Sequence, residues 1–167
     1  MLIQIIFVCL FALNLYLLWK LPWYRLPGSF IFLFLPLVTP FFDQPRFALD
    51  YFWWWVAGFI TIGLGIALIV WAQRAIGKVF TNISATPEIL VTSGPYQFFR
   101  HPVYLGLIFI FIGWWWIWSA VYAFYCGMLI LAVIWAQGYL EEKLTLEKKF
   151  GDQYREYKKE TGMFWVK

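Results

Sequence analysis

Apolar and polar residues follow one another along this chain in long blocks. Four long apolar runs cover residues 1–19, 52–72, 102–118 and 120–137. A bilayer core of ~30 Å takes about 20 mostly apolar residues in one helix, so each run has the length of a membrane-spanning helix. The pattern predicts an all-α integral membrane protein.

A fifth apolar run, residues 28–42, is shorter and is interrupted by Pro36 and Pro40. Proline is tolerated in a membrane helix where neighbouring groups satisfy the carbonyls that it frees, so we count this run as a span and expect about five transmembrane helices. Lys20 and Arg25 follow the first run instead of preceding it. This is unlike a signal peptide, and we expect the first run to stay in the chain as a helix.

The positive charges predict an orientation for these spans. Of the 13 lysines and arginines, all except Arg46 fall on the side that carries the C-terminal tail. Cytoplasmic loops carry such an excess, so we expect the C-terminus in the cytoplasm and the N-terminus outside. The tryptophans at 53–55 and 114–116 then both lie at the outer interface, where an aromatic belt is typical.

Composition narrows the classes of function. The chain has 63% hydrophobic and 13% charged residues and a formal net charge of +4. Its basic residues line membrane edges, which suits an anionic membrane surface and not a nucleic acid. Cys9 and Cys126 lie inside apolar runs without metal-ligand spacing, so we expect no metal and no disulfide.

We expect one membrane domain over residues 1–167. Its N-terminal helices occupy 1–72, and a functional loop, a helical hairpin and a C-terminal helix occupy 73–167. Within the N-terminal part, Gly58, Gly63 and Gly65 permit close helix packing. The pattern does not distinguish packing inside the chain from packing between two copies.

Polar side chains gather in two segments on the predicted cytoplasmic side, 73–104 and 138–167. The turn at Ser119 is very short, which forces the runs around it into an antiparallel hairpin. The pair Arg100 and His101, before one helix, should therefore lie near Glu141 and Glu142 at the end of the other.

We call this polar end of the hairpin the hairpin mouth. Two interpretations of it stay open. In the structural one, Arg100 neutralises Glu141 or Glu142, and His101 caps the helix that follows it. In the functional one, Gly94 and Pro95 form a turn, Pro102 starts the helix, and free backbone N–H groups receive a ligand.

The tail from Gly138 alternates apolar and charged positions at helical spacing and predicts one amphipathic helix that ends near Gly162. Such a helix can lie flat on the membrane. It can equally fold over the hairpin mouth and close a pocket there.

Four stretches within roughly the last 80 residues read LVTSGPY (90–96), RHPVYLG (100–106), EE (141–142) and FGDQYREY (150–157). In this order and at this spacing they resemble the signature of the isoprenylcysteine carboxyl methyltransferase family, which is related to the phospholipid N-methyltransferases. The resemblance implies a helical membrane enzyme that binds S-adenosylmethionine at the cytoplasmic face. It implies a lipid or lipid-modified acceptor reached from the bilayer, and S-adenosylhomocysteine as product.

The resemblance also implies site residues. A carboxylate such as Glu142 suits the ammonium group of the cofactor, and the aromatic faces of Tyr96 and Tyr104 suit a sulfonium cation. We assign Arg100 and Glu141, which lie at the same mouth, as candidate catalytic residues. Carried over residue by residue, the cofactor contacts fall on Ile89, Leu90, Val91, Tyr96, His101, Pro102, Val103, Tyr104 and Glu142.

The acceptor is less tightly specified. A carboxylate needs no general base, whereas an amine or a thiol must lose a proton, for which His101 is the candidate. Relatives that methylate prenylcysteine carry an arginine where this chain has Gly138, and a proline in the tail where it reads KKETGMFW (158–165). We expect a prenylcysteine-like carboxylate first. The alternatives are a phospholipid amine, a small thiol, or a non-catalytic or reductase-like membrane protein.

Overall fold

The computed structural model describes residues 37–48, 52–77 and 89–167, together with the single positions Cys9, Leu13, Tyr16 and Lys20. Most of the two N-terminal spans predicted at 1–19 and 28–42 lies outside the described residues. The described elements are, in chain order, the 3-10 helix η2 (Thr39–Phe41), α3 (Phe52–Ile76), the 3-10 helix η4 (Gly94–Gln97), α4 (Pro102–Trp118), α5 (Val121–Glu141), the π-helical segment η5 (Glu142–Leu146) and α6 (Glu147–Glu160).

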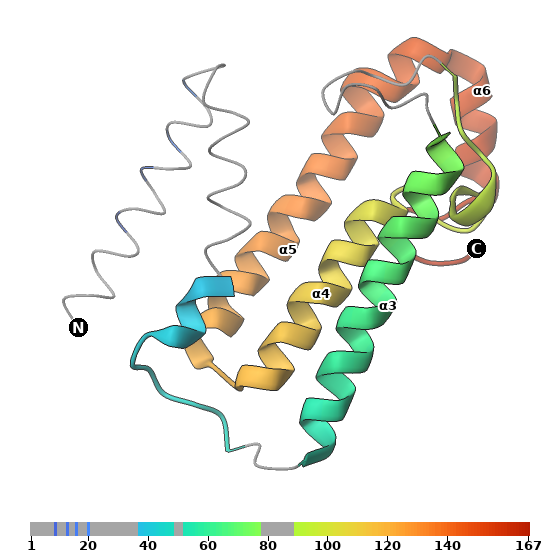
Figure 1. Ribbon diagram of the computed structural model, residues 1–167. Coiled ribbons are helices and arrows are strands. Elements are labelled where there is room, and N and C mark those ends of the chain that lie inside the picture. Colours follow the sequence, from blue (N-terminus) through green and yellow to red (C-terminus); the bar gives the residue numbers. More distant parts are fainter. Residues whose placement is uncertain are drawn as a thin grey trace.

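Three helices form the body of the described part. Figure 1 shows α3, α4 and α5 side by side, with the α4–α5 turn at one end and α6 at the other. α3 and the helical stretch that begins with α5 are long and apolar enough to cross a membrane, and α4 is a shorter apolar helix of 17 residues. The described residues are all-helical, as predicted, and include two candidate membrane helices, while the count of five spans stays a prediction.

Glycines bring α3 and α4 into close contact. A Cβ on Gly65 would lie 2.5 Å from the carbonyl oxygen of Gly106, and a Cβ on Gly106 would lie 2.7 Å from that of Gly65. Gly58 and Gly113 face each other in the same way two helical turns further on. Among the described residues, a Cβ on Gly63 would meet nothing within 4 Å. Gly58 and Gly65 therefore serve packing inside this chain.

The turn between α4 and α5 is held by the loop that precedes α3. Ser119 adopts the left-handed conformation with φ 49°. Its carbonyl accepts a hydrogen bond from the backbone N–H of Phe47 (2.7 Å). Arg46 donates to the Trp118 carbonyl at the end of α4 (2.9 Å), where the helix dipole favours a cation. The predicted antiparallel hairpin is therefore confirmed.

The tryptophan clusters lie at one level of the bundle, as the sequence predicts. The rings of Trp54 and Trp116 are 5.9 Å apart. Trp115 packs against α5 at Gly127, where a Cβ would lie 1.4 Å from Cζ2 of the indole. The assignment of this end to the outer face of the membrane stays a prediction.

The C-terminal segment differs from the single helix predicted from Gly138. α5 continues to Glu141, the backbone widens into η5, and α6 is interrupted at Gly151, which has φ 54° and ψ −125°. Glycine adopts such a conformation without the steric cost of a side chain. The bend turns the rest of α6 back toward the start of α4 (Figure 1). Of the two interpretations of the tail, the structure therefore favours the one in which it covers the mouth.

Candidate active site

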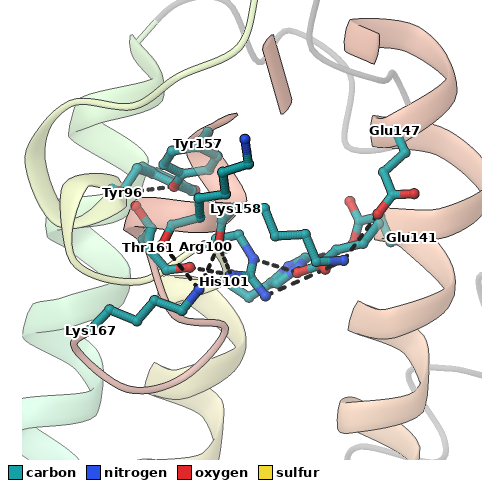
Figure 2. A network of polar contacts seen from close by, with 11 residues as sticks. Tyr96, Arg100, His101, Glu141, Glu147, Tyr157, Lys158, Thr161 and Lys167 are labelled. Atoms are coloured by element: carbon teal, nitrogen blue, oxygen red, sulfur yellow. Dashed lines mark hydrogen bonds and ion pairs between the residues drawn. The ribbon is translucent and has the colours of Figure 1, made fainter. Parts of the chain in front are cut away.

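Polar side chains collect at the end of the hairpin that lies opposite the Ser119 turn. Arg100 and His101 come directly before α4, and Glu141 and Glu142 stand at the junction of α5 and η5. Figure 2 shows Arg100, His101 and Glu141, which come from distant parts of the chain, within one set of polar contacts. The predicted approach of the two pairs is confirmed.

Glu142 lies at the centre of these contacts. Nε of Arg100 donates to Oε1 of Glu142 (2.7 Å), and Nε2 of His101 lies 3.2 Å from the same oxygen. The ammonium of Lys158, from α6, lies 3.0 Å from Oε2. Only 2% of the Glu142 side chain is exposed, so these partners replace water. We call Glu142, Arg100, His101 and Lys158 the Glu142 network.

The network keeps Glu142 ionised. Burial alone would raise the pKa of Glu142, but hydrogen bonds from His101, Arg100 and Lys158 lower this pKa to about 2. A carboxyl with a lowered pKa stabilises the fold above its ordinary pKa of 4.5, and this contribution is lost as the pH falls through about 2. At neutral pH Glu142 only accepts hydrogen bonds, so Nε2 of His101 carries the proton of their contact.

Arg100 joins three parts of the chain. Besides Glu142, its guanidinium donates to the carbonyl oxygens of Thr161 and, at 3.4 Å, of Lys158, at the end of α6. Only 8% of its side chain is exposed. In this geometry Arg100 holds Glu142 and α6 together, and its catalytic role stays a prediction.

The residues after α6, 161–164, form what we call the C-terminal strap. The backbone N–H of Arg100 donates to the Gly162 carbonyl (2.9 Å), and that of His101 donates to the Met163 carbonyl (3.3 Å). The side chain of Met163 packs against α5 at Gly138, where a Cβ would lie 2.5 Å from its Cε. The strap therefore closes one side of the Glu142 network.

The His101 ring has two aromatic neighbours among the described residues. It stacks on Tyr104 with ring centroids 5.3 Å apart, and the ring of Phe164 lies 6.2 Å away on the strap. His101 stands at the N-cap of α4, but its side chain makes no capping hydrogen bond. The predicted neutralisation of a glutamate by Arg100 is thus observed at Glu142, whereas the proposed cap by His101 is wrong.

Glu141 turns away from Glu142 and faces an open groove. Its Oε2 accepts a hydrogen bond from the Tyr104 hydroxyl (3.0 Å) and lies 4.0 Å from Nδ1 of His101. Its side chain is 40% exposed. The groove has a volume of about 520 Å³ and is lined by Tyr104, Val133, Ala136, Gln137, Leu140, Glu141, Leu144 and Thr145. An enclosed cofactor pocket stays a prediction.

The other predicted cofactor contacts lie around the Glu142 network and differ in how deeply they are buried. Tyr96 belongs to η4, and its carbonyl accepts a hydrogen bond from the Tyr157 hydroxyl of α6. Burial, and then the charge of Glu141, raises the pKa of Tyr96 to about 12, so the phenol stays neutral. Pro102 is buried in the first turn of α4, and Val103 is half-buried beside it.

The segment 89–91 is placed less centrally. Ile89 is exposed, and Leu90 and Val91 are half-buried in a stretch without regular structure. The hydrogen bonds and ion pairs found in the described ranges do not connect these three residues to the Glu142 network. Their assignment as cofactor contacts stays a prediction.

Sequence reasoning missed Lys158, Met163 and Phe164. In the sequence, nothing separates Lys158 from its neighbour Lys159, yet Lys159 pairs with the exposed Glu156 at the surface (2.6 Å). The backbone pairing of the strap with residues before α4 joins segments about 60 positions apart, and no local spacing signals it.

The chain is similar to a known protein family and to several curated proteins. The family model described as phospholipid methyltransferase matches residues 53–153. The protein-S-isoprenylcysteine O-methyltransferase of Xenopus laevis is 33% identical over 129 residues, which are 69% of this chain and 42% of the relative. The human protein of the same name is 30% identical over 129 residues, 69% of this chain and 43% of the relative. The chain thus spans less than half the length of the curated relatives that it matches.

Proposed function

The chain belongs to the phospholipid methyltransferase family, and we propose that it transfers a methyl group from S-adenosylmethionine to a hydrophobic acceptor at the cytoplasmic boundary of a membrane. One observation carries this proposal. His101 and Tyr104 of the α4 end meet Glu141 and Glu142 of the α5 end, and all four lie inside the segment that the family model matches. Polar groups at the end of apolar helices can meet a soluble cofactor and a lipid acceptor at the same place.

The side chains at this site fit the chemistry of S-adenosylmethionine. The ionised carboxylate of Glu142 suits an ammonium group, and the ring faces of Tyr96 and Tyr104 suit a positively charged sulfur. When bound, the cofactor supplies a methyl group that a nucleophile can attack without a covalent enzyme intermediate. We propose as its contacts Ile89, Leu90, Val91, Tyr96, His101, Pro102, Val103, Tyr104 and Glu142.

In this proposal, the residues of the chain position the reacting groups and exclude water from them. His101 and Glu142 are 7% and 1% exposed beneath α6 and the strap, so a group bound to them is removed from bulk water. Arg100 holds Glu142 in place. Tyr104 holds the carboxylate of Glu141 at the groove, where the acceptor approaches in our proposal.

For the acceptor, we propose first a prenylcysteine-like carboxylate, because the curated relatives are named as isoprenylcysteine O-methyltransferases. An already ionised carboxylate needs no base. The apolar wall of the groove, which includes Val133, Leu140 and Leu144, suits its hydrocarbon chain. A phospholipid amine is the second candidate. The observation that favours it is Glu141 in the groove lining, because a carboxylate attracts a cationic head group.

A labelling experiment tests the activity and the acceptor together. Purified protein in lipid nanodiscs receives methyl-labelled S-adenosylmethionine and, in separate reactions, a farnesylated cysteine, phosphatidylethanolamine or an alkyl thiol. We expect label in the farnesylated cysteine as a methyl ester that mild alkali removes. Alkali-stable label in the phospholipid would instead support the amine.

The control for this experiment is Arg155→Ala, because Arg155 pairs with Asp152 on the exposed side of α6 (2.8 Å) and outside the site. This variant should label the same acceptor as the wild type. Absence of label from all three acceptors, with protein that unfolds cooperatively, would contradict the proposed activity.

A further inference from the structure

Lys158 is held differently from the other cation that contacts Glu142. Arg100 has an 8% exposed side chain, and its guanidinium also binds the carbonyl oxygens that end α6. Lys158 has a 30% exposed side chain, and its ammonium lies 3.0 Å from Oε2 of Glu142 and 3.0 Å from Oε1 of Glu147. Lys158 can therefore leave Glu142 and keep an ion pair, whereas Arg100 cannot leave without freeing buried donors and carbonyls.

The carboxylate of Glu142 is fully used in this arrangement. Its Oε1 faces Arg100 and His101, and its Oε2 faces Lys158 and, at 3.5 Å, a second nitrogen of Arg100. Arg100 and His101 are 8% and 6% exposed, whereas Lys158 is 30% exposed, so the position of the Lys158 ammonium is the one that a further ammonium can take with the least rearrangement. An exchange of one ammonium for another also never leaves Oε2 of this buried carboxylate without its nearest cation, which would be costly.

We propose that Lys158 is a built-in competitor for the cofactor. Its ammonium holds Glu142 in the ligand-free protein, and the ammonium of the amino-acid part of the cofactor displaces it onto Glu147. The inference rests on the proposed function, because it needs an S-adenosylmethionine-type ligand at Glu142. It adds a selection step, since a nucleoside ligand without an ammonium group has nothing to exchange for Lys158.

This competition lowers the apparent affinity of the chain for the cofactor, because part of the binding free energy is used to displace Lys158 from Glu142. The test is a calorimetric titration of the purified chain with S-adenosylhomocysteine. For Lys158→Met we expect binding roughly 3- to 10-fold tighter than in the wild type, as removal of a partly exposed ion pair allows.

Lys143→Met is the matched control. Lys143 pairs with the other oxygen of Glu147 (3.3 Å) and is 46% exposed, so this change removes one positive charge from the same carboxylate without touching Glu142. Because Lys143 does not contact Glu142 but leaves Glu147 freer to receive Lys158, we expect at most a small gain in affinity, below that of Lys158→Met. The deamino analogue of S-adenosylhomocysteine is the matched ligand, and its affinity should not change in Lys158→Met.

Glu147→Gln gives a second and opposite prediction, which keeps the test valid if Lys158→Met does not fold. This change removes the carboxylate that receives the displaced lysine, so the affinity for S-adenosylhomocysteine should fall. An unchanged or weaker affinity in a folded Lys158→Met would overturn the inference, because Lys158 would then be a bystander or a direct ligand. No saturable binding to the wild type would instead overturn the proposed function itself.

Discussion

Glu142→Ala should lower the free energy of unfolding by about 3–5 kcal/mol, because it leaves the cations of Arg100 and Lys158 without their shared carboxylate in a buried site. Glu141→Ala should lower it by less than about 1 kcal/mol. Glu141 is 40% exposed, and among the described residues its hydrogen-bonding partner is the hydroxyl of Tyr104. Two adjacent glutamates thus form a matched pair, with a large expected loss of stability at Glu142 and a small one at Glu141.

Denaturant unfolding in a mild detergent, followed by tryptophan fluorescence, measures both changes. Lys159→Ala, which removes an exposed pair with Glu156, is the control and should unfold like the wild type. If Glu141→Ala and Glu142→Ala lost the same free energy of unfolding, Glu142 would not be the one glutamate of the pair whose burial stabilises the fold.

Gly65→Leu should disrupt the packing of α3 against α4, at a cost of about 3 kcal/mol, the upper end of what overpacking typically costs. A Cβ at this position already lies 2.5 Å from the carbonyl oxygen of Gly106 and 2.9 Å from Cγ1 of Ile110, and the first of these is backbone that cannot rotate away. Because α4 begins next to His101, we expect this variant also to lose S-adenosylhomocysteine binding.

Gly63→Leu is the matched control on the same helix, because a Cβ there meets nothing within 4 Å in the part of the chain that the structure describes. We expect its stability to stay within about 0.5 kcal/mol of the wild type. The yield of folded protein by size-exclusion chromatography and the denaturant midpoint measure both variants. A stable, ligand-binding Gly65→Leu would show that the two helices do not need this close contact.

The hairpin could be predicted because strong local signals mark its limits. Proline suits the first turn of a helix, so Pro102 marks the start of α4, and Ser119 lies between two apolar runs that are too long to be one span. The approach of Arg100 and His101 to the pair Glu141 and Glu142 follows from this geometry. The contact of Gly65 with Gly106 could not be predicted, because the same small residues also suit an interface between two copies.

The C-terminal part was less predictable for physical reasons. The amphipathic spacing continues through η5 and across Gly151, so it does not reveal the bend that brings Lys158 to Glu142. Adjacent residues point about 100° apart on a helix. Which of Glu141 and Glu142 is buried therefore depends on the helix phase where α5 widens into η5, and the sequence does not specify that phase.

The most direct test of the account is a titration of the purified chain with S-adenosylhomocysteine, compared with the His101→Ala variant. His101 contacts Glu142 (3.2 Å), Tyr104 and the strap, so it joins the groups that we assign to the cofactor. The account predicts saturable binding to the wild type and a loss of at least about 10-fold in affinity for a folded His101→Ala. No saturable binding to the wild type, or equal binding to both proteins, would contradict it.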